Sequence, residues 1–156
     1  MHPILNEIET ALKEGGIDPE LRYGFALQCV EEVAGNLEDE SALASFERFK
    51  FLVNHFNGAS LDALASLAQE MRKIAQSHPG SQSIDGSRHA AVSATYALAK
   101  AVEGDAVQAA AYAAYSSVYG YGGYAVNDAD SFSEVHQKQR EKLLQLIAKR
   151  ERNGAL

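Results

Sequence analysis

Hydrophobic residues recur every three or four positions along nearly the whole chain, the spacing that places side chains on one face of an α-helix. No segment shows the clear alternation of a half-buried strand. Proline, glycine and asparagine interrupt the pattern at intervals, and helix-capping residues follow several of the interruptions. The pattern predicts seven helices, over about residues 3–13, 18–34, 40–55, 60–77, 87–102, 105–119 and 131–152.

The ends and faces of these helices can be predicted in more detail. Asp18 and Pro19 are typical of an N-cap and a first helical residue, and Ser60 is expected to cap the fourth helix. The third helix has an apolar stripe of Ala42, Phe46, Phe49, Val53 and Phe56. The last helix has a stripe of Phe132, Val135, Leu143, Leu146 and Ile147. Both stripes are expected to face the core.

The fifth and sixth predicted helices differ from the rest because about half of residues 90–114 are alanine. Alanine favours helix and leaves little side-chain volume, so two such helices can approach closely. We therefore expect an all-α, single-domain bundle of about seven helices over residues 1–156, with a closely packed alanine-rich pair at its centre. Residues 81–86 are expected to form a loop, and residues 153–156 a frayed tail.

Charge and composition restrict the partners. The net charge is -7, and residues 1–62 hold about twelve acidic against four basic residues, whereas residues 131–156 hold about three against six. An acidic surface does not favour nucleic acid, which requires clustered lysine and arginine, but it permits a basic protein partner or simply confers solubility. No segment reaches the length of a membrane span, and no signal peptide is evident. We expect a cytoplasmic protein.

Catalytic and metal-binding chemistry is not expected. The five histidines are scattered, and no two have the spacing that places two imidazoles on one metal ion. The single cysteine, Cys29, lies on the apolar stripe of the second helix and is expected to be a buried, inert thiol. No cofactor motif is present, and Tyr121 and Tyr124 flank glycines that lack the spacing of a phosphate loop. The chain is therefore not expected to be an enzyme.

Two groups of residues are candidates for binding a partner. Tyrosines are frequent in recognition surfaces, and Tyr121 and Tyr124 lie next to a glycine-rich turn. Carboxylates cluster at the predicted end of the second helix and in the following loop, where they are expected to be exposed: Glu31, Glu32, Glu38, Asp39 and Glu40. Solvated charge and a docking patch are the two interpretations of that cluster.

The chain also resembles a known family. Residues 21–33, with the form Ala-x-x-Cys-x-Glu, are similar to the opening helix of the predicted all-helical immunity proteins numbered five in bacterial polymorphic toxin systems. The alanine-rich segments 88–94 and 106–115, the segment 120–125, and the amphipathic helix around residues 141–144 extend the likeness over most of the chain. The resemblance implies a protein that neutralises a cognate toxin by direct binding, through an acidic face suited to a basic active cleft.

Two other functions are compatible with the residues. The first is a small-molecule-binding bundle, in which Arg88, His89, Tyr96 and Tyr112 line a pocket between the alanine-rich helices. The second is a homo-oligomeric structural module that assembles through the alanine faces or through the last helix. A convergent polar pocket around His89 favours the first, and exposed apolar stripes favour the second.

Overall fold

The computed structural model describes residues 1–14, 18–77, 87–121 and 129–154, and these residues contain helices and no strand. The elements are α1 (Pro3–Glu14), α2 (Pro19–Glu31), the 3-10 turn η1 (Ala34–Asn36), α3 (Glu40–Asn54), α4 (Ser60–Ser77), α5 (Ser87–Val102), α6 (Ala106–Tyr121) and α7 (Ala129–Gly154). The expected all-helical bundle of about seven helices is confirmed. The expected loop at residues 81–86 lies outside the described residues.

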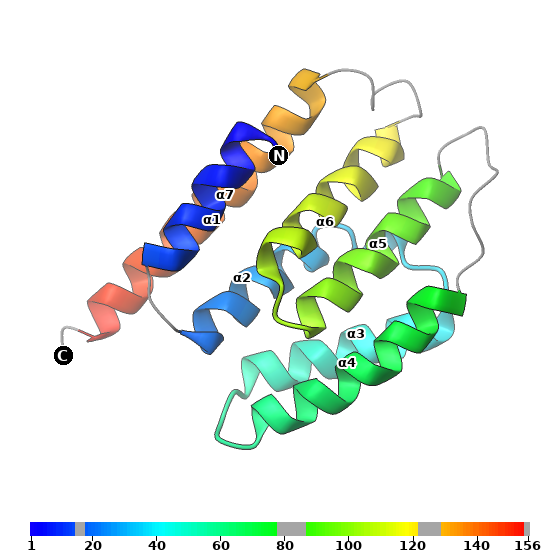
Figure 1. Cartoon of the computed structure of the whole chain (residues 1–156), viewed down its shortest axis with the longest axis horizontal. Coiled ribbons are helices and arrows are strands. Elements are labelled where there is room, and N and C mark those ends of the chain that lie inside the picture. The colour runs from blue at the N-terminus through cyan, green and yellow to red at the C-terminus, as the bar shows by residue number, and fades with distance from the viewer. Residues whose placement is uncertain (15–17, 78–86, 122–128, 155–156) are drawn as a thin grey trace.

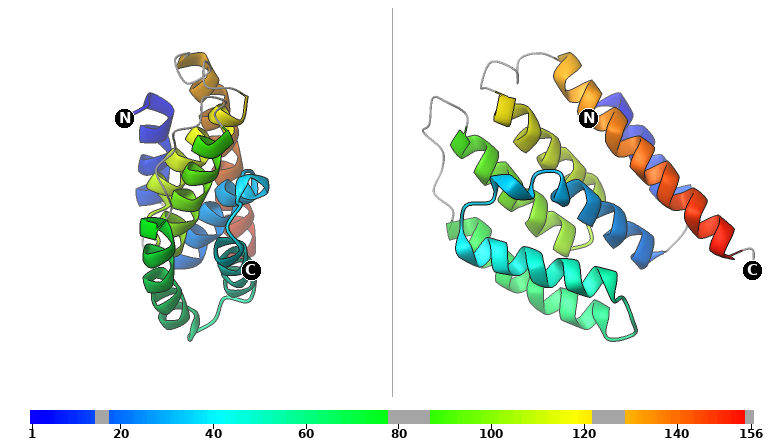
Figure 2. Two further views of the ribbon diagram at one scale, coloured as in Figure 1. Left: turned by 90° about the vertical axis from the view of Figure 1, so that its right-hand side faces the viewer. Right: turned by 180° about the vertical axis from the view of Figure 1, so that it is seen from behind.

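The helices form two stacked layers (Figures 1 and 2). One layer contains α1, α6, α5 and α4, in that order from side to side, and the other contains α7, α2 and α3. Contacts between the helices agree with this order, because α5 packs on both α6 and α4, and α2 packs on α6, α5, α3 and α7. The first and last helices lie side by side, so the two ends of the chain close one edge of the bundle.

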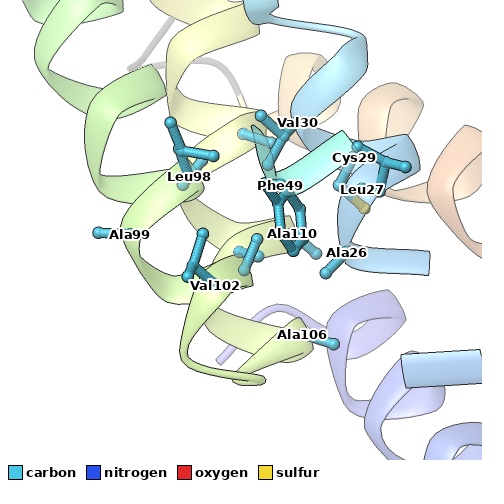
Figure 3. Packing of buried hydrophobic residues seen from close by; sticks show 14 of the residues in the cluster. Ala26, Leu27, Cys29, Val30, Phe49, Leu98, Ala99, Val102, Ala106 and Ala110 are labelled. Atoms are coloured by element: carbon cyan, nitrogen blue, oxygen red, sulfur yellow. The ribbon is translucent and has the colours of Figure 1, made fainter. Parts of the chain in front are cut away.

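The alanine-rich pair, α5 and α6, forms the most extensive helix–helix contact among the described residues, in agreement with the expected close packing. Many small side chains of α5 and α6 are fully buried, and they include Ala91, Ala94, Ala97, Ala101, Ala106, Ala109, Ala110 and Ala114. Larger residues fill the space that the pair leaves toward the second layer. Phe49 of α3 is completely buried there and lies among Val30, Leu98, Val102 and Ala110 (Figure 3). The core is therefore asymmetric, with a thin alanine seam in one layer and bulky side chains between the layers.

Helix α2 begins as predicted and ends earlier than predicted. The Asp18 carboxylate accepts a hydrogen bond from the backbone N–H of Leu21 at 3.2 Å, and Pro19 occupies the first helical turn. The helix was expected to continue to residue 34, but it ends at Glu31. The N–H of Val33 bonds to the carbonyl of Val30 at 3.0 Å, so the chain tightens from an α-helical to a 3-10 pattern and continues into η1.

Other helix ends correct the predictions by a few residues. Ser60 is the first residue of α4 rather than its cap, and its Oγ accepts a hydrogen bond from the backbone N–H of Asn57. The Asn57 side chain instead accepts from the N–H of Ala59 at 2.8 Å, a turn that starts the helix. Helix α6 extends to Tyr121, and the helical backbone of α7 extends to Gly154, two residues into the expected tail.

Helix α7 connects the two layers by charge as well as by packing. Its Arg140 forms an ion pair with Glu7 of α1 at 3.2 Å. Near its C-terminus, Arg150 pairs at 2.6 Å with Asp18, the residue that caps α2, and at 3.5 Å with Glu20. Exposed pairs of this kind contribute about 0–1 kcal/mol each. Two of the basic residues in excess on the last helix, Arg140 and Arg150, are thus paired with acidic residues elsewhere in the chain.

Candidate binding surfaces

The acidic residues singled out from the sequence are all exposed and belong to the short segment that joins α2 to α3. Residues 31–40 run from the end of α2, through η1, to the start of α3. These ten residues include five exposed carboxylates: Glu31, Glu32, Glu38, Asp39 and Glu40. We call these five residues the acidic corner. The turn is held against the alanine-rich pair, because Asn36 Nδ2 donates to Ser116 Oγ at 3.0 Å and that hydroxyl donates to the Ala90 carbonyl at 2.7 Å.

The carboxylates of the acidic corner have different local roles. Glu32 forms an ion pair with Lys142 of α7. Asp39 caps α3, accepting hydrogen bonds from the backbone N–H groups of Ser41 and Ala42 at 2.7 and 3.2 Å. The other three members, Glu31, Glu38 and Glu40, form no ion pair with another described residue. Their charge is therefore available to a partner.

The solvent face of α3 continues the acidic corner with two exposed apolar side chains. Leu43, Glu47 and Phe51 follow Glu40 at intervals of three and four residues, so the four side chains lie along one face. Leu43 is 39% exposed and Phe51 is 61% exposed, and the Phe51 ring stacks on His55 with its centroid 4.3 Å away. We call these four residues the α3 ridge.

The ridge was not predicted from the sequence, where the apolar repeat of this helix indicated a core-facing stripe that does not include Phe51. Phe51 lies only two residues after Phe49, and two residues turn an α-helix by roughly 200°, so the two rings point to opposite sides. The spacing of the two phenylalanines in the sequence therefore indicates that Phe51 lies off the core-facing stripe. A phenylalanine off the apolar stripe is an exposed aromatic side chain, and such residues are frequent anchors in protein interfaces.

Four tyrosines of the alanine-rich pair are half-buried or exposed: Tyr96 of α5, and Tyr112, Tyr115 and Tyr119 of α6. His89 stacks on Tyr119 with a centroid separation of 4.8 Å, and Tyr96 stacks on Tyr112 at 5.5 Å. Tyr115, which is 44% exposed, contacts Tyr119 at 6.3 Å. A second neighbour of the Tyr115 ring is Phe132 at the start of α7, at 5.1 Å. We call these six residues the aromatic face.

The residues expected to line a small-molecule pocket are thus distributed over two ring stacks. His89, Tyr96 and Tyr112 are each half-buried against another ring. The backbone of Arg88 belongs to α5, and its side chain lies outside the described residues. Tyr121 is the last residue of α6, its side chain is likewise not described, and Tyr124 lies outside the described residues altogether.

A cleft lined by described residues lies elsewhere, between α2, α6 and α7. Its volume is about 710 Å³, and its lining includes acidic residues (Glu32, Glu134 and Glu141) and basic residues (Lys138 and Lys142), of which all but Glu32 belong to α7. A smaller cleft of about 380 Å³ lies between α2, α3 and α7. Neither cleft is lined by the six residues of the aromatic face.

Two histidines from opposite ends of the chain, His2 before α1 and His136 of α7, lie next to each other. The rings of His2 and His136 have centroids 4.9 Å apart, and His136 is only 3% exposed. His2 Nδ1 accepts a hydrogen bond from the N–H of Ile4 at 3.1 Å, and its Nε2 lies 3.1 Å from Ser133 Oγ. Helix α1 is therefore capped by an imidazole.

The buried histidine is held by a glutamine of the same helix. Gln139 Nε2 donates to the Ala110 carbonyl at 3.0 Å, so its Oε1 accepts from His136 Nδ1 at 2.8 Å. Burial lowers the pKa of His136, its hydrogen bond to Gln139 acts in the opposite direction, and the neighbouring His2 lowers the pKa further. Neither residue was predicted to be buried. Their spacing was a signal, because positions 136 and 139 lie between Phe132 and Leu143 in the apolar repeat of the helix.

Reactive groups are few among the described residues. Burial raises the pKa of the Cys29 thiol to about 12, with Lys142 acting weakly in the opposite direction, so the thiol stays protonated at neutral pH. In the described ranges, no group of three or more His, Cys, Asp or Glu side chains is placed to hold a metal ion. Within the same ranges, no helix has the length and apolar character needed to cross a membrane.

Comparison with known proteins identifies no relative of this chain: no family model, no curated protein and no solved structure matches it.

Proposed function

We propose that this protein is a non-catalytic inhibitor of the immunity type, which neutralises a cognate toxin in the cytoplasm by covering a basic cleft. The observation that carries the proposal is the acidic corner, where Glu31, Glu38 and Glu40 are exposed and form no ion pair with a described residue. Clefts that bind nucleic acid or other polyanions are basic, so a face of this charge complements them. The resemblance of the sequence to predicted immunity proteins supplies the biological setting.

The α3 ridge would add affinity to the charge of the corner. Exposed charges accelerate association but contribute little affinity by themselves, whereas an aromatic side chain buried at the centre of an interface contributes much more. Phe51 offers such an anchor, and Glu40 and Glu47 lie beside it on the same helix face. The corner and the ridge share Glu40, so the ridge adds exposed apolar side chains to the charged ones, a combination that recognition surfaces use.

The direct test is co-expression with the product of the adjacent gene, followed by purification of the pair. We expect the chain to rescue growth of a host that produces a toxic product and to copurify with it. The double variant Glu38→Lys/Glu40→Lys should lower the association rate by about tenfold or more at low salt, and by less at high salt. Glu151→Lys/Glu70→Lys is the matched control, because both residues are exposed and lie outside the corner. A product that still kills, with no complex on purification, overturns the proposal.

A second candidate function, small-molecule binding, has one observation in its favour. The cleft between α2, α6 and α7 has a volume of about 710 Å³, within the range of about 300–1,000 Å³ that is usual for ligand pockets. Lys138 and Glu134 line it and pair with each other at 3.8 Å across one turn of α7, so a small zwitterion would exchange with both partners of that exposed pair. Thermal-shift screening of amino acids and short peptides tests this function, with Lys138→Gln as the variant that should abolish any stabilisation.

A further inference from the structure

Helix α6 reaches solvent without a single charged side chain. None of the residues from Ala106 to Tyr121 is Asp, Glu, Lys or Arg, although the chain as a whole has a net charge of -7. On the neighbouring α5, no Asp, Glu, Lys or Arg occurs between Arg88 and Lys100. The uncharged stretches of the two helices lie side by side in the centre of one layer (Figure 1).

The outer side of this pair is aromatic and only partly covered. Gln108 and Tyr115 are exposed there, and Tyr112 and Tyr119 are half-buried on the same side of α6. The rings support one another by stacking, so their orientations are already restricted before any partner binds. Preformed aromatic side chains lose little conformational entropy on binding, which favours their use in interfaces.

We propose that the aromatic face is a homodimer interface, occupied by the same face of a second copy of this chain. Two copies with a net charge of -7 repel each other over most of their surfaces, and contact is least opposed where both partners are uncharged. A twofold axis places one patch against itself, so an uncharged patch meets another uncharged patch. The alanine faces are not available for this contact, because they are already buried between α5, α6 and α2.

The dimensions of the face set the strength of the contact. The stretch of α6 from residue 108 to residue 119 is about 17 Å long at 1.5 Å per residue, and the face is two helices wide. That is a small patch in comparison with the roughly 800 Å² that each partner contributes to a standard interface. The dimer should therefore dissociate at concentrations in the micromolar range. The acidic corner belongs to the other layer, so the dimer would leave both corners accessible.

Sedimentation velocity of the purified full-length chain tests the proposal, over about 1 to 300 µM. We expect a reversible shift from monomer to dimer, with Tyr115→Lys weakening association at least tenfold. Tyr115→Phe should retain the dimer, since the ring remains. Phe51→Lys is the matched control, because it adds the same charge at an exposed aromatic residue of the other layer and should not change association.

Two further measurements distinguish loss of the dimer from loss of folding. Gln108→Lys places a charge on the same face without removing a ring, so it must also weaken the dimer even if Tyr115→Lys proves unstable. Circular dichroism establishes that each variant is folded. A chain that remains monomeric at about 300 µM overturns the proposal, as does a dimer that Phe51→Lys disrupts and Gln108→Lys does not. The proposed inhibitor function is independent of either outcome.

Discussion

Phe49 and Phe51 provide an internal comparison of what burial contributes to the stability of this fold. The two residues have the same side chain, lie on the same helix, and are separated by one residue, but Phe49 is 0% exposed and Phe51 is 61% exposed. The Phe49 ring fills the space between the layers and meets Tyr23 edge to face at 6.5 Å. The Phe51 ring lies on the surface, where its one ring neighbour among the described residues is His55.

The expected magnitudes differ by several kilocalories per mole. Phe49→Ala removes a fully buried ring and leaves a cavity, a change that lowers the free energy of unfolding by about 3–5 kcal/mol. At roughly 2–4 °C per kcal/mol for a domain of this size, the melting temperature should fall by about 6–20 °C. Phe51→Ala removes mostly solvated surface and should change the free energy of unfolding by about 0.5 kcal/mol or less.

Urea denaturation followed by circular dichroism at 222 nm measures both variants against the wild type. The slope of the free energy with urea should stay constant while the midpoint moves, because the surface exposed on unfolding is nearly unchanged. Equal destabilisation by the two substitutions would refute the orientation of α3 on which the core and the ridge both depend. A large loss for Phe51→Ala alone would mean that the helix is rotated by about half a turn.

Two further predictions concern titratable groups. Burial lowers the pKa of His136 in the folded state below its ordinary value of 6.5. As the pH falls through 6.5, this histidine therefore binds a proton in the unfolded chain before it does so in the folded chain. The free energy of unfolding should decrease over this pH range, until the pH reaches the lower pKa of the folded state. Urea midpoints at neutral and mildly acidic pH should show a smaller decrease for His136→Asn, and an equal decrease in both proteins would contradict this account. The Cys29 thiol, with its pKa raised to about 12, should react with a disulfide reagent at pH 8 only as fast as the fold opens. Immediate stoichiometric labelling of the native protein would show that the thiol is accessible.

Local sequence signals were sufficient to predict the helices and most of their contacts with the core. The periodic placement of residues such as Phe46 and Leu64, the capping by Asp18 and the low volume of the alanines all act within a few residues of chain. The alanine-rich segments could be paired from composition alone, because small side chains permit close approach. The acidic corner could likewise be named from the sequence, because charge clusters at helix ends are normally exposed.

The relations between distant residues were decided only by the tertiary structure. The contact of His2 with His136, the anchoring of η1 through Ser116, and the pairing of Arg150 with the cap of α2 join positions that no local period connects. Ring stacking across α5 and α6 likewise depends on how the two helices are rotated against each other. The sequence by itself determined which faces are apolar, since helical periodicity is a property of a short segment. Which of those faces are covered, and which stay open to a partner, followed only from the packing of the two layers, because burial depends on neighbours supplied by the rest of the chain.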